Sequence, residues 1–136
     1  MITSEAIERD AVIVACAISA GIHAALTPGH FNEAPGAGLG FLASVVLLTG
    51  LVGALTWWPP SPVTLGGTVA VLAGLVGSYL LATTSGFPLL HPDPESVDGL
   101  ALFTKAIEVV GLLAAAHLLW RVRPALALTL HERREH

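Results

Sequence analysis

Two segments of this sequence combine histidines with carboxylates. The first holds His23, His30 and Glu33, the second holds His91 and Glu95, and neither contains Lys or Arg. Imidazole nitrogens and carboxylate oxygens are the ligands that zinc, copper(II), iron and manganese prefer in proteins. If the fold brings the two segments together, these five residues are candidate ligands of one transition-metal ion.

The small number of sulfur ligands makes some metals less suitable than others. Cys16 and Met1 are the only sulfur-containing residues, which argues against copper(I), an ion that prefers thiolates and thioethers. The spacing of His23, His30 and Glu33 matches no dedicated metal motif, so polar loops without a ligand are the alternative interpretation. The sequence also lacks a nucleophile elbow, a P-loop and a His-Glu-x-x-His motif. Whether the protein is an enzyme therefore stays open.

A charged pair lies inside an otherwise apolar segment. Lys105 and Glu108 are three residues apart, which places them side by side on one face of a helix. A carboxylate inside a membrane costs roughly 2–4 kcal/mol on insertion scales unless it is paired or protonated, so Glu108 is expected to face other helices. The pair is a candidate proton or ion relay, and a purely structural ion pair is the alternative. Thr104 is a candidate hydrogen-bond partner of Glu108, and Ser19 of His23.

The remaining histidines give little support to a haem site. Two axial histidines must lie at the same depth on facing helices, whereas His23 and His117 fall near opposite ends of their predicted helices, about 20 Å apart or more by helix rise. The sequence therefore argues against a haem held by two histidines and leaves a haem with one histidine ligand open. His117 is interpreted as solvated or bonded to a carbonyl, and His131 and His136 as part of a charged tail.

The composition indicates the environment in which these residues act. The chain has 136 residues, of which 54% are apolar and 12% are charged, and its mean hydropathy is +0.75. Soluble domains carry about 25% charged residues, so this chain cannot cover a water-facing surface, and lipid is the expected solvent. The net charge of −4 comes without a basic patch, so no nucleic acid is expected as a partner.

Four apolar runs are long enough to cross a membrane, since a spanning helix needs about 20 residues. Pro28 and Pro59 are expected to end the first and second runs, and Pro124 follows the fourth, because proline removes a backbone donor from a helix. The acidic start of the chain argues against a cleaved signal peptide. The sequence predicts one domain with helices at about 11–27, 36–58, 63–84 and 100–122, outer loops at 28–35 and 85–99, and a tail at 123–136.

Short connections make antiparallel neighbours, so we expect an all-α, four-helix transmembrane bundle that runs up-down-up-down. All the arginines fall on the side that holds both chain ends, and the positive-inside rule then places both termini in the cytoplasm. Trp57, Trp58 and Trp120 fall at the same interface, which indole rings prefer. The expected location is the cell membrane, with the histidine segments on the outer face. The arginines are Arg9, Arg121, Arg123, Arg133 and Arg134.

The residues around the histidines also form a pattern along the chain. The pattern consists of His23, Pro28-Gly29-His30, Phe31-Asn32-Glu33, Gly86-Phe87-Pro88, His91, Glu95, Val97 and Glu108. It resembles uncharacterised small four-helix integral membrane proteins of bacteria such as actinobacteria. The resemblance covers most of the chain and implies a polytopic membrane protein with polar residues gathered at one end, but no activity. A Pro-rich run at 91–95 departs from the more Gly-rich loop of that pattern.

The sequence supports three functional hypotheses. The first is a membrane protein that binds a transition-metal ion through the five candidate ligands at the extracytoplasmic end of the bundle. The second is a non-catalytic accessory or structural subunit of a larger membrane complex. The third is a small transporter that works as a homo-oligomer, which would need a polar path from Glu108 to the inner face.

Overall fold

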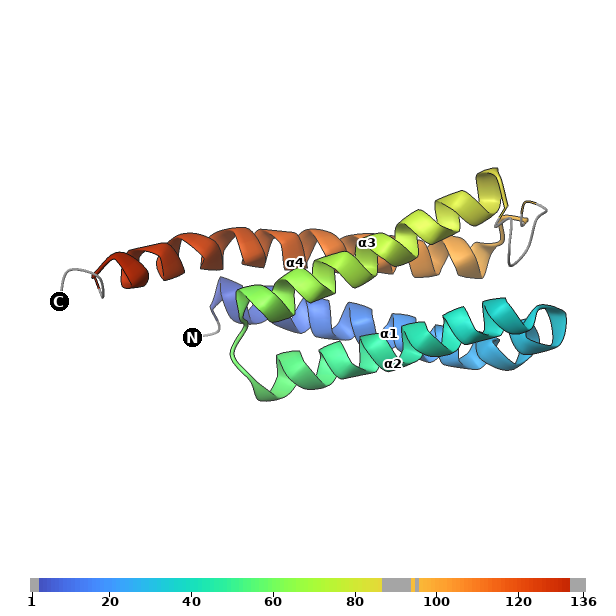
Figure 1. Cartoon of the computed structure of the whole chain (residues 1–136), viewed down its shortest axis with the longest axis horizontal. Coiled ribbons are helices and arrows are strands. Elements are labelled where there is room, and N and C mark those ends of the chain that lie inside the picture. Colours follow the sequence, from blue (N-terminus) through green and yellow to red (C-terminus); the bar gives the residue numbers. More distant parts are fainter. Residues whose placement is uncertain (1–2, 87–93, 95, 133–136) are drawn as a thin grey trace.

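Four long α-helices run antiparallel to their neighbours in a computed structural model (Figure 1). The structure describes residues 3–86, 94 and 96–132, with side chains as far as Val122. Every helix is long and apolar enough to cross a membrane, which confirms the predicted up-down-up-down bundle and fits a multi-pass membrane protein. The helices are α1 (Ser4–Glu33), α2 (Pro35–Trp57), α3 (Pro62–Thr84) and α4 (Gly99–Glu132).

The two ends of the bundle carry different connections. At one end, which we name the terminal end, α1 begins, α4 ends and α2 connects to α3 (Figure 1). The opposite end, the loop end, carries the α1–α2 and α3–α4 connections. Trp57, Trp58 and Trp120 are 78%, 64% and 71% exposed and belong to the terminal end, as expected of an indole belt at a membrane interface. The placement of this end in the cytoplasm stays a prediction.

Pro28 does not end α1, contrary to the prediction. The helix continues to Glu33, and the expected loop at 28–35 is reduced to Ala34. A proline inside a membrane helix is tolerated where neighbouring helices and local adjustment satisfy the freed carbonyl. Pro35 does reverse the chain, because its ring forces the preceding residue out of the helical region. Ala34 accordingly has φ −150° and ψ 108°, and Pro35 starts α2 at the position where proline is favoured.

The other helix ends follow from capping residues. Ser61 caps α3 through its hydroxyl, which accepts a backbone N–H at 3.1 Å, and Asp98 caps α4 through its carboxylate, which accepts one at 2.7 Å. These positions lie close to the predicted boundaries. The exception is the far end of α4, which passes Pro124 and ends at Glu132 rather than near residue 122.

Each helix packs against its neighbours in sequence, and α4 closes the ring against α1. The packing is loosest between α2 and α3, which join at the terminal end and diverge toward the loop end (Figure 1). The interior of the terminal half is mainly apolar, and the hydroxyl of its buried Thr68 donates to the Thr64 carbonyl at 2.9 Å. Its buried residues include Val12, Cys16, Leu48, Leu55, Leu65, Leu72, Ala115, Leu118 and Leu119.

The closest approach between α1 and α4 depends on a glycine. A Cβ at Gly111 would lie 2.7 Å from the Cβ of Ala15 and 3.3 Å from the Cδ1 of Leu72. Small residues at such positions let helix backbones approach in lipid, where dispersion contacts rather than the hydrophobic effect hold helices together. Gly111 therefore helps to set the α1–α4 spacing one turn below Glu108.

Candidate functional site

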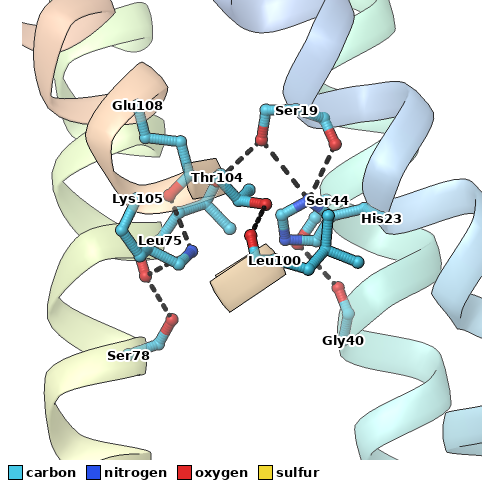
Figure 2. Close-up of polar contacts among 10 residues, drawn as sticks. All are labelled: Ser19, His23, Gly40, Ser44, Leu75, Ser78, Leu100, Thr104, Lys105 and Glu108. Carbon is cyan, nitrogen blue, oxygen red and sulfur yellow. Dashed lines mark hydrogen bonds and ion pairs between the residues drawn. The ribbon is translucent and has the colours of Figure 1, made fainter. Parts of the chain in front are cut away.

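A fully buried carboxylate lies at the centre of the polar contacts in the loop half (Figure 2). The Oε1 atom of Glu108 accepts a hydrogen bond from the Ser19 hydroxyl at 2.6 Å, and its Oε2 atom accepts one from Lys105 Nζ at 2.6 Å. Lys105 Nζ also donates to the carbonyl oxygen of Leu75 at 3.3 Å. The network joins α1, α3 and α4, and it compensates a charge whose burial would otherwise be costly.

The structure confirms some of the predicted contacts around Glu108 and corrects one. The Lys105–Glu108 pair forms as expected, and the Ser19 hydroxyl lies 3.3 Å from Nδ1 of His23. Thr104 was expected to bond Glu108, but its hydroxyl donates to the carbonyl of Leu100 at 2.7 Å. A threonine inside a helix reaches the carbonyl one turn back without competition from distant groups. The sequence did not predict the bond from Ser19 to Glu108, because it joins residues 89 positions apart.

The two histidines of α1 share one bonding arrangement. Nδ1 of His23 lies 2.8 Å from the Ser19 carbonyl oxygen, and Nδ1 of His30 lies 3.0 Å from the Leu26 carbonyl oxygen. A carbonyl oxygen only accepts, so each Nδ1 must carry the hydrogen. In the neutral ring, each Nε2 then keeps its lone pair.

Phe41 of α2 contacts both imidazoles. Its ring stacks on His30 with centroids 3.8 Å apart and an interplanar angle of 20°, and it lies 5.1 Å from His23 at 39°. The two histidines are two helical turns apart on α1, about 10 Å by helix rise. Phe41 therefore holds both rings on the α2 side of the bundle, with each ring tilted toward its own backbone acceptor.

A cavity of about 280 Å³ opens in the loop half and is lined by residues from all four helices. Most of its wall is apolar, and Glu108 lies behind the wall rather than on it. Tyr79 contributes a hydroxyl that is buried without a hydrogen-bond partner in the described part of the chain. The polar lining consists of His23, His30, Ser44, Ser78, Tyr79, Asp98, Thr104 and Lys105.

The predicted metal ligands meet only in part. His23 and His30 lie on the same cavity, whereas Glu33 is exposed at the end of α1 and does not line it. His91 and Glu95 lie outside the described residues. Among the described side chains, those of 3–86, 94 and 96–122, no group of three His, Cys, Asp or Glu is placed to hold a metal ion.

The sequence placed Ser78 and Tyr79 in the outer half of the third helix but did not assign them to this site. Tyr79 is the only tyrosine of the chain, and the Lys105 ammonium lies 5.5 Å from its ring centroid. A lone tyrosine deep in an apolar run was a usable signal, because a buried phenol normally has a hydrogen-bond partner. Ser44 and Ser78 gave no such signal, since serines that bond their own helix are common in membrane spans.

A second polar cluster links α1 to α4 in the terminal half. Glu8 accepts from Nδ1 of His117 at 2.9 Å and lies 3.5 Å from the Arg121 guanidinium. His117 is thus bonded to a carboxylate, whereas the sequence predicted that it is solvated or bonded to a carbonyl. All three groups are partly exposed, so this cluster resembles a surface ion-pair group at a helix end.

Comparison with protein-family models, curated proteins and solved structures finds no match to this chain. The architecture supports the coarse resemblance to small four-helix membrane proteins, and no family is shown. By its fold the chain is a small four-helix membrane protein.

Proposed function

We propose that this membrane protein binds a divalent transition-metal ion at the loop end, through the imidazoles of His23 and His30. The observation that carries the proposal is the bonding of the two rings: both line one cavity, and both commit Nδ1 to a backbone carbonyl. A metal-bound histidine typically donates its other ring N–H in this way, which fixes the tautomer and leaves Nε2 for the metal. Zinc, copper(II), iron and manganese accept such nitrogen ligands.

The remaining ligands must come from the segment between α3 and α4. No third His, Cys, Asp or Glu among the described residues completes a site with the two histidines, so at least one of the proposed ligands His91 and Glu95 is required. Asp98 lines the same cavity, but its carboxylate caps α4 and does not form a group with the two histidines. Glu33 is the weakest of the proposed ligands, because it is exposed beyond the cavity.

The buried ion pair has a supporting role in this proposal. Glu108 already accepts from Ser19 and Lys105, and Ser19 in turn contacts His23. The pair therefore orients the serine next to the first proposed ligand. A proton relay through Glu108 stays a prediction from the sequence, because a metal ion would displace a proton from Nε2 of the imidazole, whereas Ser19 contacts Nδ1.

The transporter hypothesis has less support. From Glu108 toward the terminal end, the described interior is built mainly from apolar side chains such as Val12, Leu72 and Leu118. The buried Thr68 is polar, but its hydroxyl already bonds the carbonyl of Thr64. An ion needs polar groups at each step of a path through a membrane, because an unsolvated charge is costly in hydrocarbon. The accessory-subunit hypothesis and a homo-oligomer stay predictions from the sequence.

Elemental mass spectrometry of the purified protein tests the metal proposal. Wild-type protein in detergent, incubated with each of the four metals and desalted, should retain one of them near one ion per chain. A His23→Ala, His30→Ala, His91→Ala triple variant should retain almost none, because it loses three nitrogen ligands.

A His117→Ala variant is the matched control, since His117 belongs to the terminal-end cluster with Glu8. It should retain as much metal as the wild type. Negligible metal in the wild type with all four ions, or equal metal in the wild type and the triple variant, would overturn the proposal.

A further inference from the structure

The cavity borders the interface between α2 and α3, the least tightly packed pair of neighbouring helices. We call this interface the seam. The cavity walls include Gly40 and Ser44 of α2 and Ser78 and Ala82 of α3, the two helices that diverge toward the loop end (Figure 1). All four residues are small, and Gly40 is exposed. The seam therefore leaves an opening between α2 and α3 beside the polar network.

This opening lies on the side of the bundle, where it faces the lipid. Both α2 and α3 are membrane-spanning by length and hydropathy, so the seam between them meets hydrocarbon rather than water along most of its length. A molecule that enters through the seam must therefore dissolve in lipid. The cavity of about 280 Å³ is also far larger than an ion needs, since a cavity of about 150 Å³ already holds a benzene ring.

The polar wall presents mainly hydrogen-bond acceptors. The hydroxyls of Ser44, Ser78 and Thr104 donate to carbonyls of their own helices, at 2.8, 3.0 and 2.7 Å (Figure 2). Each hydroxyl has then used its hydrogen, so it can only accept a further hydrogen bond. The two histidines likewise keep lone pairs at Nε2. A ligand that bonds to these acceptors must carry a hydrogen-bond donor.

Two donors stand beside these acceptors. The Tyr79 hydroxyl is buried without a partner in the described part of the chain. Lys105 Nζ has three hydrogens and bonds Glu108 and Leu75 in the structure, so one hydrogen is left. The two charged groups of the wall are already engaged, since Lys105 pairs with Glu108 at 2.6 Å and Asp98 accepts a backbone N–H at 2.7 Å. Neither of them therefore requires a charged head group. A hydroxyl group, which both donates and accepts, complements this wall without adding a charge.

We propose that the α2–α3 seam admits a bilayer-dissolved amphiphile with an uncharged, hydroxyl-bearing head, which binds in the loop-half cavity with its tail in the lipid. The head contacts the acceptors of the wall and takes the Tyr79 hydroxyl as a donor. The apolar tail passes Gly40 and lies between α2 and α3. This ligand does not require the metal ion, and it binds the metal-free cavity, because both ligands would use Nε2 of the same two histidines.

Photolabelling in lipid nanodiscs tests the proposal with a 4-octylphenol that carries a diazirine next to the ring. The buffer contains a metal chelator, so failure of the metal proposal leaves this result unaffected. Labelled peptides should map to the cavity walls on α2 and α3. Unlabelled 4-octylphenol should compete about tenfold better than its methyl ether, 4-octylanisole, because loss of one hydrogen bond to the wall is worth about that factor.

Two glycines of α2 provide a matched pair of variants. A Cβ at Gly40 or at Gly50 meets no atom within 4 Å, so both positions have space for a side chain, but only Gly40 lines the cavity. The Gly40→Leu variant fills the seam and should lower cavity labelling about tenfold or more. The Gly50→Leu variant should label like the wild type.

The Tyr79→Phe variant separates a binding role from a structural one. Removal of a buried hydroxyl that lacks a partner should leave thermal stability equal or higher, while labelling falls. Labelling that spreads over the lipid-facing surfaces and does not respond to Gly40→Leu or Tyr79→Phe would overturn the proposal, as would equal competition by the methyl ether.

Discussion

The loop half and the terminal half of the bundle differ in what fills the space between their helices. In the terminal half, Val12, Leu65 and Leu118 are fully buried and pack as in an ordinary apolar core. In the loop half, Glu108 is equally buried, and its contacts border a cavity lined by two histidines. The same four helices thus support close packing at one end and an open polar site at the other.

The difference is informative because lipid does not demand polar groups inside a bundle. Apolar side chains could fill the loop half at little cost, and replacing a buried ion pair by apolar residues is often neutral or stabilising. Ionisable groups inside a membrane therefore indicate function more than stability. The terminal half shows that mainly apolar packing is enough to hold these helices together. The loop half has buried polar groups instead, and it is where we propose that the metal ion and the amphiphile bind.

The largest expected effect comes from breaking the ion pair. The Lys105→Met variant leaves Glu108 buried with only the Ser19 hydroxyl as a partner, which should lower stability by about 3–5 kcal/mol. Reversible unfolding in mixed micelles, followed by circular dichroism, measures the change.

A double variant sharpens this result. Lys105→Met combined with Glu108→Leu removes both charges, so stability should return close to the wild-type value, while labelling of the cavity changes. If the double variant is no more stable than Lys105→Met alone, Glu108 does not depend on Lys105 for compensation, and the two halves differ less than their contacts indicate.

A smaller effect is expected where the apolar half packs most closely. The Gly111→Ala variant places a methyl group 2.7 Å from the Cβ of Ala15, and such overpacking typically costs about 1–3 kcal/mol. The same unfolding measurement applies. Ala15→Gly combined with Gly111→Ala should recover most of the loss, and failure to do so would show that the α1–α4 spacing is not limited by this contact.

The smallest effect is expected at the terminal-end cluster. Exposed ion pairs contribute little to stability because water and salt screen them, so Glu8→Gln should leave the unfolding transition and the metal content unchanged, although it weakens the contacts with His117 and Arg121. A clear loss of stability, or of bound metal, would extend the functional region beyond the loop half.

The helices could be read from the sequence more reliably than their ends. Hydropathy over a span is a local property, so all four spans were predicted. Pro28 was taken as a helix end, but in the structure α1 continues to Glu33. A proline removes only one hydrogen bond, and the surroundings of the helix decide whether that loss is tolerated. The chain reverses at Ala34 instead, because the ring of Pro35 forces the adjacent residue out of the helical region.

The contacts of the candidate site also fall into two groups, those between residues close in sequence and those between distant residues. The pairing of Lys105 with Glu108 and of Ser19 with His23 follows from helical spacing of three and four residues, so the sequence alone predicted both contacts. The sequence also predicted, from the topology, that His91 and Glu95 lie close to His23 and His30. This stays a prediction. The bond from Ser19 to Glu108 and the place of Tyr79 in the cavity needed the structure.

The sequence by itself determined that the chain forms four apolar helices with an ionisable pair inside one of them, since these features depend on neighbours along the chain. Only the tertiary structure decided which faces meet, how far α2 and α3 separate, and which side chains share the cavity. The physical reason is the solvent: in lipid, inward and outward faces of a helix are both apolar, so the sequence pattern does not mark the face that turns inward. The rotation of each helix is set by packing and by a few polar contacts between distant residues, such as Ser19 with Glu108.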